Sequence, residues 1–381
     1  MSAYHQMGHD SENLLSEEGL SVYKGAILSP VNYNLGKIIA QVRWSRQRGD
    51  FTTIFDPQLY VPNSDRGCLR EWPYFPNDVD SADLSSEAWW NGLLDSLVAT
   101  CVDIGPTAVC SPVVLPNVYT DDYFANIVAV GDRLCARMTG TPIRPMQSAV
   151  IGLPDLATPD RAMTIASILS RCHAGHVYLV FVGVTEPRRE LSEVDEIKGA
   201  MKLISALGRS GLEVTVGFTS SDVVLWKAAG AAHCATGKFF NLRRFTRTRF
   251  EEPGQGGGQL PYWYEESLMA FLRQSDVARV LPLNLPQSNP SRNSFGEQVI
   301  EQLRSDPSKA WLALAWRQFM FWFADVEARL TTGSLDAAAL LRTADTNWRT
   351  LDEMDLLMEE RRNDGAWVRQ WRRALAELRV G

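Results

Sequence analysis

Residues suited to binding an anion are concentrated between Gly230 and Arg249. This stretch begins as an apolar strand, turns at Gly237 and continues into a run of basic and aromatic residues. Its positively charged residues are Lys238, Arg243, Arg244, Arg247 and Arg249. Because the formal net charge of the chain is -7, a local positive cluster predicts a specific anionic partner. A solvated basic loop is the alternative interpretation.

Two carboxylates are candidates for proton transfer. Asp56 follows five mostly apolar residues and precedes Pro57. A carboxylate in this position can have a raised pKa or point at a substrate, and an Asx-type turn is the alternative. Glu186 lies in the sequence VGVTEPRRE, where an ion pair with Arg188 or Arg189 is the competing interpretation. We expect Asp56 and Glu186 to be the catalytic residues.

The histidines and cysteines do not predict a metal site. His173, His176 and His233 have no acid or thiol at metal-ligand spacing, and the six cysteines form no CxxC pair. In a chain of 381 residues, scattered cysteines indicate reduced thiols in a cytoplasmic protein. Cys234 lies within an apolar strand and is expected to be a packed thiol. We therefore expect no metal and no cofactor.

The composition is typical of a soluble globular protein. Apolar residues make up 45% and charged residues 22%, which allows a large core. No window reaches the ~20 apolar residues that a membrane helix needs, so we expect no membrane partner. The start of the chain is polar and acidic and lacks the layout of a signal peptide. Residues 1–20 are expected to form a flexible tail.

An alternation of strands and helices must position these candidate residues. The predicted strands are 25–34, 50–60, 108–115, 146–152, 176–183, 213–218 and 231–236. The predicted helices are 35–48, 86–104, 121–138, 158–172, 192–209 and 222–229. Short connections between such elements demand parallel strands with right-handed crossovers. The count favours an α/β fold, a (β/α)8 TIM-like barrel over residues 21–290, with residues 277–285 as its last strand. A doubly wound open sheet is the alternative, although no GxGxxG follows the first strand.

In such a barrel the functional site lies at the carboxyl ends of the strands. That rule selects Asn32, Asn34, Asp56, Gln58, Ser111, Asn117, Gln147, Asp155, Glu186, Arg188, Thr219, Ser220, Asp222, Thr236 and Lys238. From these and the arginine-rich stretch we expect the ligand to be bound by Gln58, Gln147, Asp222, Thr236, Gly237, Lys238, Arg243, Arg244 and Arg247. Gly237 would let the backbone approach a ligand closely, and arginine suits bidentate contacts with phosphate.

Residues 291–381 are predicted to be helical, because apolar residues recur at spacings of three and four. Six of the twelve tryptophans lie in this region, which is typical of helix–helix packing. A face for a protein partner, or a stacking platform for bases, is the alternative. Five arginines interspersed with acids indicate a solvated face: Arg361, Arg362, Arg369, Arg372 and Arg373.

The order of elements from Asp50 to Arg249 resembles the tRNA-guanine transglycosylase type of barrel. In that family an early strand ends in an aspartate that handles the base, and Asp56 in IFDPQ matches that place. Gln147 in MQSAVIG resembles the family's glutamine on a middle strand. The stretch GLEVTVGFTSSDVVLWKAAGAAHCATGKFFNLRRF is similar to the family's strand–turn–helix–strand segment, which leads into an arginine-bearing substrate loop. The resemblance implies a nucleobase, a nucleotide or a nucleic acid as ligand.

Two features of that family are missing from this sequence. The nucleophilic aspartate would fall near 234–236, where this chain has no acid, and no CxCxxC zinc motif follows Arg249. Three functions therefore stay open. The chain is a transglycosylase-like enzyme, a barrel without catalysis that serves as a binding or scaffold subunit, or a barrel enzyme for another phosphorylated substrate that is held near Gly237 and Lys238.

Overall fold

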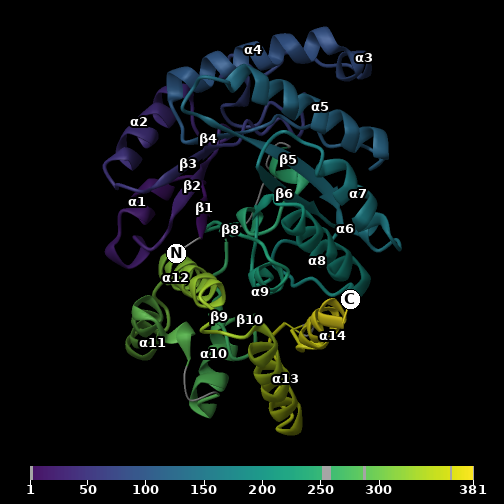
Figure 1. Ribbon diagram of the computed structural model, residues 1–381. Helices are drawn as coiled ribbons and strands as arrows, with labels where there is room; N and C mark the ends of the chain where they lie inside the picture. The colour runs from purple at the N-terminus through teal and green to yellow at the C-terminus, as the bar shows by residue number, and fades with distance from the viewer. Residues whose placement is uncertain (1–2, 251–258, 286–288, 361–362, 381) are drawn as a thin grey trace.

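The computed structural model describes residues 3–250, 259–285, 289–360 and 363–380. Eight parallel strands form a closed barrel in chain order (Figure 1). They are β1 (Tyr4–Gln6), β2 (Gly25–Leu28), β3 (Thr52–Phe55), β4 (Ala108–Cys110), β5 (Arg144–Gly152), β6 (His176–Val182), β7 (Glu213–Val216) and β8 (His233–Thr236). The predicted α/β barrel is confirmed, and the closed strand order excludes the open sheet.

The strand that closes the barrel is β1, which the sequence pattern did not reveal. Tyr4 pairs with Gly25 of β2 on one side and with Ala235 of β8 on the other. All three residues of β1 are buried. Residues 1–20 were expected to be a flexible tail, and the structure corrects this, because they provide β1 and the short helix α1 (Ser11–Leu15). The strand sequence Tyr-His-Gln is too short and too polar to show the apolar pattern of a buried strand.

The position of the eighth strand is a second correction. The last strand of the barrel is β8, and residues 277–285 instead lie in α10 (Gln274–Val280) and the 3-10 turn Leu281–Leu283. Since β1 already occupies the place between β2 and β8, the barrel has no room for a further strand. Pro282 also removes a backbone donor from a segment that would need a complete ladder.

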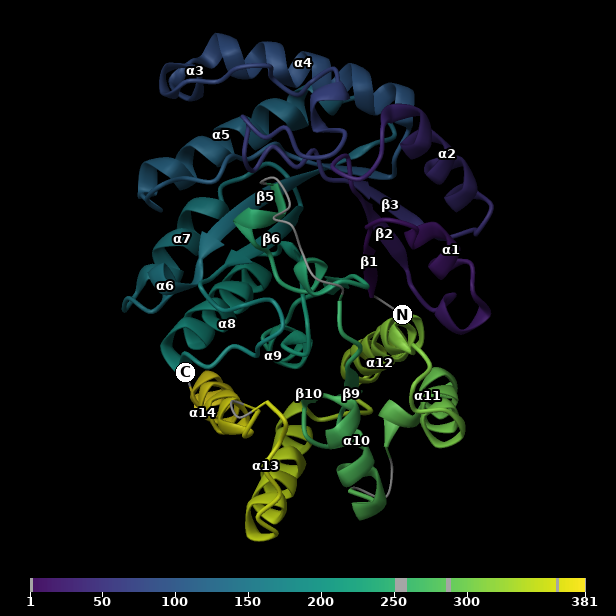
Figure 2. The same ribbon diagram turned by 180° about the vertical axis from the view of Figure 1, so that it is seen from behind.

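Helices cover the outside of the barrel (Figures 1 and 2). They are α2 (Leu35–Arg46), α3 (Ser81–Ser85), α4 (Glu87–Ile104), α5 (Asp121–Met138), α6 (Leu153–Leu156), α7 (Arg161–Leu169), α8 (Val194–Arg209) and α9 (Val223–Ala228). The side chains of Ser86 and Thr120 accept backbone N–H groups in the first turns of α4 and α5, which fixes where these helices begin. Each long helix turns an apolar face to the strands, as Ile197 and Ile204 of α8 illustrate.

The chain after β8 forms a hairpin and helices that pack against one side of the barrel (Figure 1). These elements are β9 (Trp263–Glu265), β10 (Ala270–Leu272), α10, α11 (Ser294–Ser305), α12 (Leu312–Thr331), α13 (Ala337–Glu353) and α14 (Ala366–Val380). We call them the C-terminal layer. Within it α12 contacts α9 and the hairpin, and α14 contacts α8.

The tryptophans of the C-terminal layer are mostly core residues. Five of the six are buried: Trp311, Trp322, Trp348, Trp367 and Trp371. Trp322 illustrates the arrangement, because its Nε1 donates to Glu266 at 2.7 Å and its ring centroid lies 4.0 Å from that of Tyr264. Packing therefore accounts for most of this aromatic content. Within the described residues no helix is both long and apolar enough to cross a membrane.

Deleting residues 1–8 should prevent stable folding, because β2 and β8 would each lose a parallel partner and leave two open edges. We expect the truncated chain to be insoluble, or to lose the cooperative thermal transition followed by circular dichroism. His9→Ala is a suitable control, because this side chain is 72% exposed, and it should keep the wild-type midpoint. A truncated chain with an unchanged midpoint would show that β1 is dispensable.

Candidate functional site

Four aromatic side chains fill the mouth of the barrel at the carboxyl ends of the strands. The ring centroid of Phe245 lies 5.0 Å from that of Tyr60 and 5.2 Å from that of Phe218, and Phe250 lies 5.3 Å from Tyr60. We call Tyr60, Phe218, Phe245 and Phe250 the aromatic plug. A backbone bridge between Val182, at the end of β6, and Phe245 holds the plug in place. The arginine-rich stretch therefore closes the barrel with its phenylalanines.

Asp56 lies beneath the aromatic plug and is only 2% exposed. Its Oδ2 accepts from the Tyr60 hydroxyl at 2.8 Å, and its Oδ1 accepts from the backbone N–H of Gln58 at 3.0 Å. Burial raises the pKa of Asp56 to about 6, against the opposing effect of these hydrogen bonds and of Arg249. The bond from Asp56 to the N–H two residues on is the Asx-type contact named as the alternative.

Several buried polar groups lie around Asp56 and along the barrel axis. The Gln58 Oε1 accepts from the Ser29 hydroxyl at 3.1 Å, while Arg249 donates to Asn32 at 2.9 Å. Some buried polar atoms have no hydrogen-bond partner within the described residues: Gln6 Nε2, Gln58 Nε2, Thr236 Oγ1 and Arg249 Nε. Asp56 and Gln58, both predicted as site residues, thus share one buried polar cluster, while Thr236 is buried at the end of β8.

The remaining basic residues of the stretch point in different directions. Arg243 is buried and donates to the carbonyls of Gly237 and Lys238, both at 2.9 Å. The Lys238 ammonium lies 5.2 Å from the centroid of the Trp316 ring. Arg244 pairs with Asp222 at 3.2 Å, and Arg247 is exposed. The structure therefore does not gather these residues around one ligand position.

Two further predicted residues lie apart from the barrel mouth. Gln147 Nε2 donates to the Ile127 carbonyl of α5 at 3.0 Å, so this side chain joins β5 to a covering helix. Gly131 permits that contact, because a Cβ there would come within 2.0 Å of Gln147 Oε1. Glu186 is exposed and pairs with Arg189 at 3.2 Å, which is the predicted ion pair.

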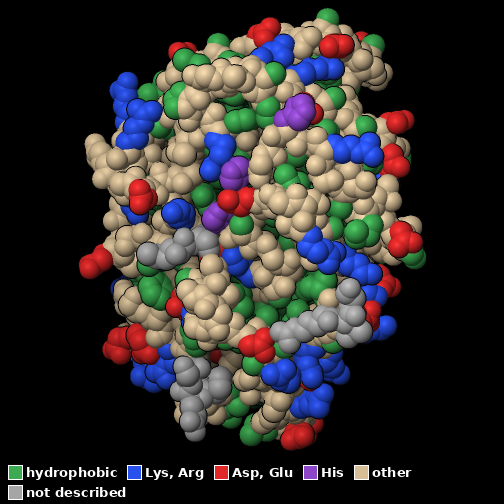
Figure 3. All heavy atoms as spheres, viewed as in Figure 1, with side chains coloured by type: hydrophobic (Ala, Val, Ile, Leu, Met, Phe, Trp, Pro, Cys, Tyr) green, Lys and Arg blue, Asp and Glu red, His purple; other side chains and the backbone are tan. Residues whose placement is uncertain are grey.

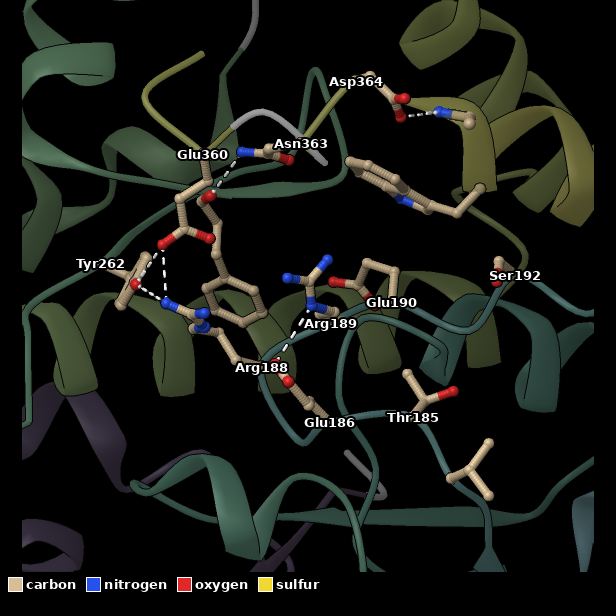
Figure 4. A pocket seen from close by; sticks show the side chains of 14 residues that line it. Thr185, Glu186, Arg188, Arg189, Glu190, Ser192, Tyr262, Glu360, Asn363 and Asp364 are labelled. Carbon is tan, nitrogen blue, oxygen red and sulfur yellow. Dashed lines mark hydrogen bonds and ion pairs between the residues drawn. The ribbon is translucent and has the colours of Figure 1, made fainter. Parts of the chain in front are cut away.

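A cavity of about 500 Å³ lies beyond the carboxyl end of β6, between the β6–α8 loop and the C-terminal layer (Figure 4). One wall consists of loop residues: Val184, Thr185, Glu186, Arg188, Arg189, Glu190 and Ser192. The other consists of Tyr262, Phe271, Glu360, Asn363, Asp364, Ala366 and Trp367. We call this cavity the β6 pocket. It lies at the carboxyl ends of the strands, where barrel proteins generally have their functional sites.

Glu190 is the most perturbed group that lines the β6 pocket. Both of its carboxyl oxygens are buried without a hydrogen bond of good geometry, and the Ser221 hydroxyl, which also has no such bond, lies close enough to lower the pKa of Glu190 slightly against the larger effect of burial. Burial raises the pKa of Glu190 to about 8, and the charge of Asp222 adds to this effect while that of Arg244 opposes it. The carboxyl is therefore mostly protonated near neutral pH, when it can both donate and accept a hydrogen bond. Trp367 Nε1 is a second buried, unpartnered group on the opposite wall.

The rim of the β6 pocket joins the two walls. Arg188 Nη1 lies 2.8 Å from Glu360 Oε1, and the Tyr262 hydroxyl donates to the same oxygen at 2.5 Å (Figure 4). Arg188 also donates to the Tyr262 hydroxyl. Asn363 donates to the Phe271 carbonyl at 2.9 Å. The two contacts of Arg188 tie the β6–α8 loop to the C-terminal layer, and the other two lie within that layer.

Sequence reasoning missed Glu190 and the opposite wall of the pocket. Glu190 is the last residue of the sequence VGVTEPRRE. Charged residues that follow an apolar strand in this way could have indicated a site residue at this position. Tyr262, Asn363 and Trp367 could not be found in this way, because only the folded C-terminal layer brings them to the end of β6. Within the described part of the chain, no group of three or more histidines, cysteines or acids is arranged to hold a metal ion.

No family model and no curated protein matches this chain. Among solved structures, it is similar to the CutC protein of Streptococcus agalactiae, with a TM-score of 0.39 and 12% identity over 65% of this chain and 100% of that one. For an L-ribulose 3-epimerase the TM-score is 0.39, with 11% identity over 87% and 97% of the two chains. For the tryptophan synthase alpha subunit of Legionella pneumophila the TM-score is 0.37, with 11% identity over 86% and 92%. None of the three is a tRNA-guanine transglycosylase, and likeness at this level carries no argument about activity.

Glu190→Gln should reduce the dependence of stability on pH. The folded pKa of Glu190, about 8, lies above the ordinary value of ~4.3, so the folded state binds more protons than the unfolded state between these values. The free energy of unfolding of the wild type therefore falls as the pH rises through this window, and glutamine removes that loss. Urea unfolding at about pH 5 and about pH 8 measures the difference, with the exposed Glu186→Gln as control. Identical pH profiles for wild type and Glu190→Gln would contradict the burial of an unpaired carboxyl.

Proposed function

We propose that this TIM-barrel protein binds a nucleotide in the β6 pocket, with Glu190 contacting the base. The observation that carries the proposal is that Glu190, whose buried carboxyl has no hydrogen bond of good geometry among the described residues, lines a cavity of about 500 Å³. Unsatisfied buried polar groups are costly, so a site that keeps one gains free energy when a ligand pairs with it. The volume lies within the ~300–1,000 Å³ that is usual for small-molecule sites.

The polar groups of the pocket match the edge of a nucleobase. Because both groups are buried in this structure, the proposal requires that they turn toward the ligand, where protonated Glu190 offers a donor beside an acceptor and the Trp367 indole offers a donor only. Purines and pyrimidines present ring N–H groups and carbonyls at neighbouring positions, which such a set can pair. Tyr262 and Phe271 line the same cavity and supply aromatic surface for stacking.

Arg189 is the residue best placed for the phosphate. Its side chain is 35% exposed, and its ion pair with Glu186 is a surface contact with a partner that is 65% exposed. Such pairs contribute only ~0–1 kcal/mol, so a phosphate can replace Glu186 at low cost. Arg188, which is fixed by Glu360 and Tyr262, has a role in shaping the rim.

Glu190 also suits proton transfer to or from the bound base. A pKa of about 8 lies close to neutral pH, where a general acid or base is most effective. Base exchange of the transglycosylase type needs a nucleophilic carboxylate as well. Asp56 is sealed under the aromatic plug, and Asp222 is buried in an ion pair with Arg244. The proposal is therefore nucleotide binding with acid–base chemistry at Glu190.

The aromatic plug favours a second candidate, in which the chain is a binding or scaffold subunit without catalysis. Phe245 and Phe250 occupy the mouth, where most barrel enzymes place substrate. Under this candidate a protein partner would use surfaces other than the tryptophans of the C-terminal layer, since five of the six are buried. The same ligand titrations separate the two candidates.

We place the protein in the cytoplasm, as part of the same proposal. All six cysteines are free thiols, three of them buried in the core, which suits a reducing compartment.

Glu190→Ala should weaken nucleotide binding at least about tenfold, because a lost buried hydrogen bond costs ~1–3 kcal/mol. Arg189→Ala should weaken binding of a nucleoside monophosphate but leave binding of the matching nucleoside unchanged. Isothermal titration calorimetry against the four common ribonucleosides and their monophosphates measures both effects.

Glu186→Ala is the matched control, since it removes an exposed carboxylate from the same loop and should not weaken binding. If the wild type binds none of these compounds, or if Glu190→Ala binds them equally well, the nucleotide proposal fails and the scaffold candidate takes its place.

A further inference from the structure

A groove between α13 and α14 is lined by five arginines and encloses about 540 Å³. Arg342 and Arg349 come from α13, and Arg369, Arg372 and Arg373 come from α14. The rest of the lining consists of Ala338, Asp345, Leu375 and Ala376. Figure 3 shows Lys and Arg side chains gathered over these two helices. We call this feature the arginine groove; Arg361 and Arg362, which the sequence pattern also singled out, lie outside the described residues.

Helical spacing explains why these side chains share one groove. On α13, Arg342, Asp345 and Arg349 are separated by three and four residues and therefore lie on one face. On α14, Arg369 is followed at the same spacings by Arg372 and Arg373. The opposite faces carry buried tryptophans, so packing fixes the backbone on which the arginines stand.

A buried acid orients three of the five guanidinium groups. Asp345 is 2% exposed, and it pairs with Arg372, with Arg349 at 2.9 Å and with Arg369 at 3.8 Å. One carboxylate cannot neutralise three cations. Arg349 and Arg369 keep more than half of their side-chain surface exposed, so both can also bind a ligand.

Two acids flank the groove and reduce its charge without cancelling it. Asp336 lies 3.8 Å from Arg342, and Glu377 lies 3.1 Å from Arg373. Glu377 also pairs with Lys198 of α8 at 2.6 Å. Five arginines thus face three carboxylates in a chain whose formal net charge is -7. The excess positive charge is local, which favours an anion that fits this groove.

The spacing of the arginines favours an anion with several phosphates. Arg342 and Arg349 are seven residues apart, which corresponds to about 10 Å along the axis of α13. Such a spacing suits phosphates joined in a row, each of which fits the fork of a guanidinium. The groove lining contains no aromatic residue on which a base could stack.

We propose that the arginine groove is a binding site for a compact oligophosphate, a small anion with three or more linked phosphates. The site is separate from the β6 pocket, and it does not depend on the nucleotide proposal. Inorganic tripolyphosphate has three linked phosphates and neither a base nor a sugar. It is therefore a suitable probe for this site.

Isothermal titration calorimetry of the full-length protein with tripolyphosphate tests the proposal. The wild type should bind saturably, and less tightly as the salt concentration rises from about 50 mM to about 200 mM. Arg342→Ala together with Arg373→Ala should weaken binding at least about tenfold, the loss expected for two charge-assisted contacts. The matching double lysine variant should recover only part of the affinity, because lysine lacks the bidentate fork.

The control variant is Arg43→Ala together with Arg209→Ala, which removes the same charge from exposed positions on α2 and α8. It should bind tripolyphosphate like the wild type, as should Glu190→Ala. Thermal unfolding without ligand verifies that the groove variants stay folded. Absence of saturable binding by the wild type, or an equal loss in the control, would overturn the proposal. It would also be overturned if a 12-nucleotide single strand bound more tightly than tripolyphosphate through the same two arginines, since the occupant would then be a nucleic acid.

Discussion

The buried guanidinium of Arg243 joins the barrel to the C-terminal layer. Its central carbon lies 3.8 Å from the centroid of the Phe319 ring of α12, while its N–H groups bond the carbonyls of Gly237 and Lys238 just after β8. Burial lowers the pKa of Arg243 to about 9, against the opposing effects of Tyr23 and Glu190, and no carboxylate lies within ion-pair distance of it among the described residues. A charge in such a place is stable only because carbonyl dipoles and aromatic faces replace water. This exchange helps to position the C-terminal layer on the barrel, together with the packing of α12 on α9 and of α14 on α8.

The β6 pocket follows from that junction. The barrel alone supplies the loop with Glu190, and the docked layer supplies Tyr262 and Trp367 on the other side. The aromatic plug fills the mouth of the barrel, and the β6 pocket lies off the barrel axis, near the end of β6. The strands of the barrel therefore do not define the candidate site by themselves, because the C-terminal layer provides one of its two walls.

The sequence predicted the repeating part of the fold better than the site. Seven strands were visible because buried parallel strands such as β6 are almost continuously apolar. The strand β1 was missed, since three residues that include His5 and Gln6 carry no such signal. The strand-end rule placed Asp56 and Gln58 directly after β3, where the structure has them buried. The direction of each arginine after Gly237 could not be predicted, because local spacing in an irregular segment does not reveal which partner each side chain meets.

The closure of the barrel by β1 has a consequence for synthesis of the chain. The strand β1 leaves the ribosome before the other strands of the barrel, but one of its two neighbours, β8, appears only after more than two hundred further residues. Until then β1 has one unpaired edge, and the growing sheet cannot close. Contacts between such distant segments form slowly, and exposed strand edges invite association with other chains. The nascent protein therefore passes through a long interval in which a chaperone that covers strand edges would improve the yield of folded molecules.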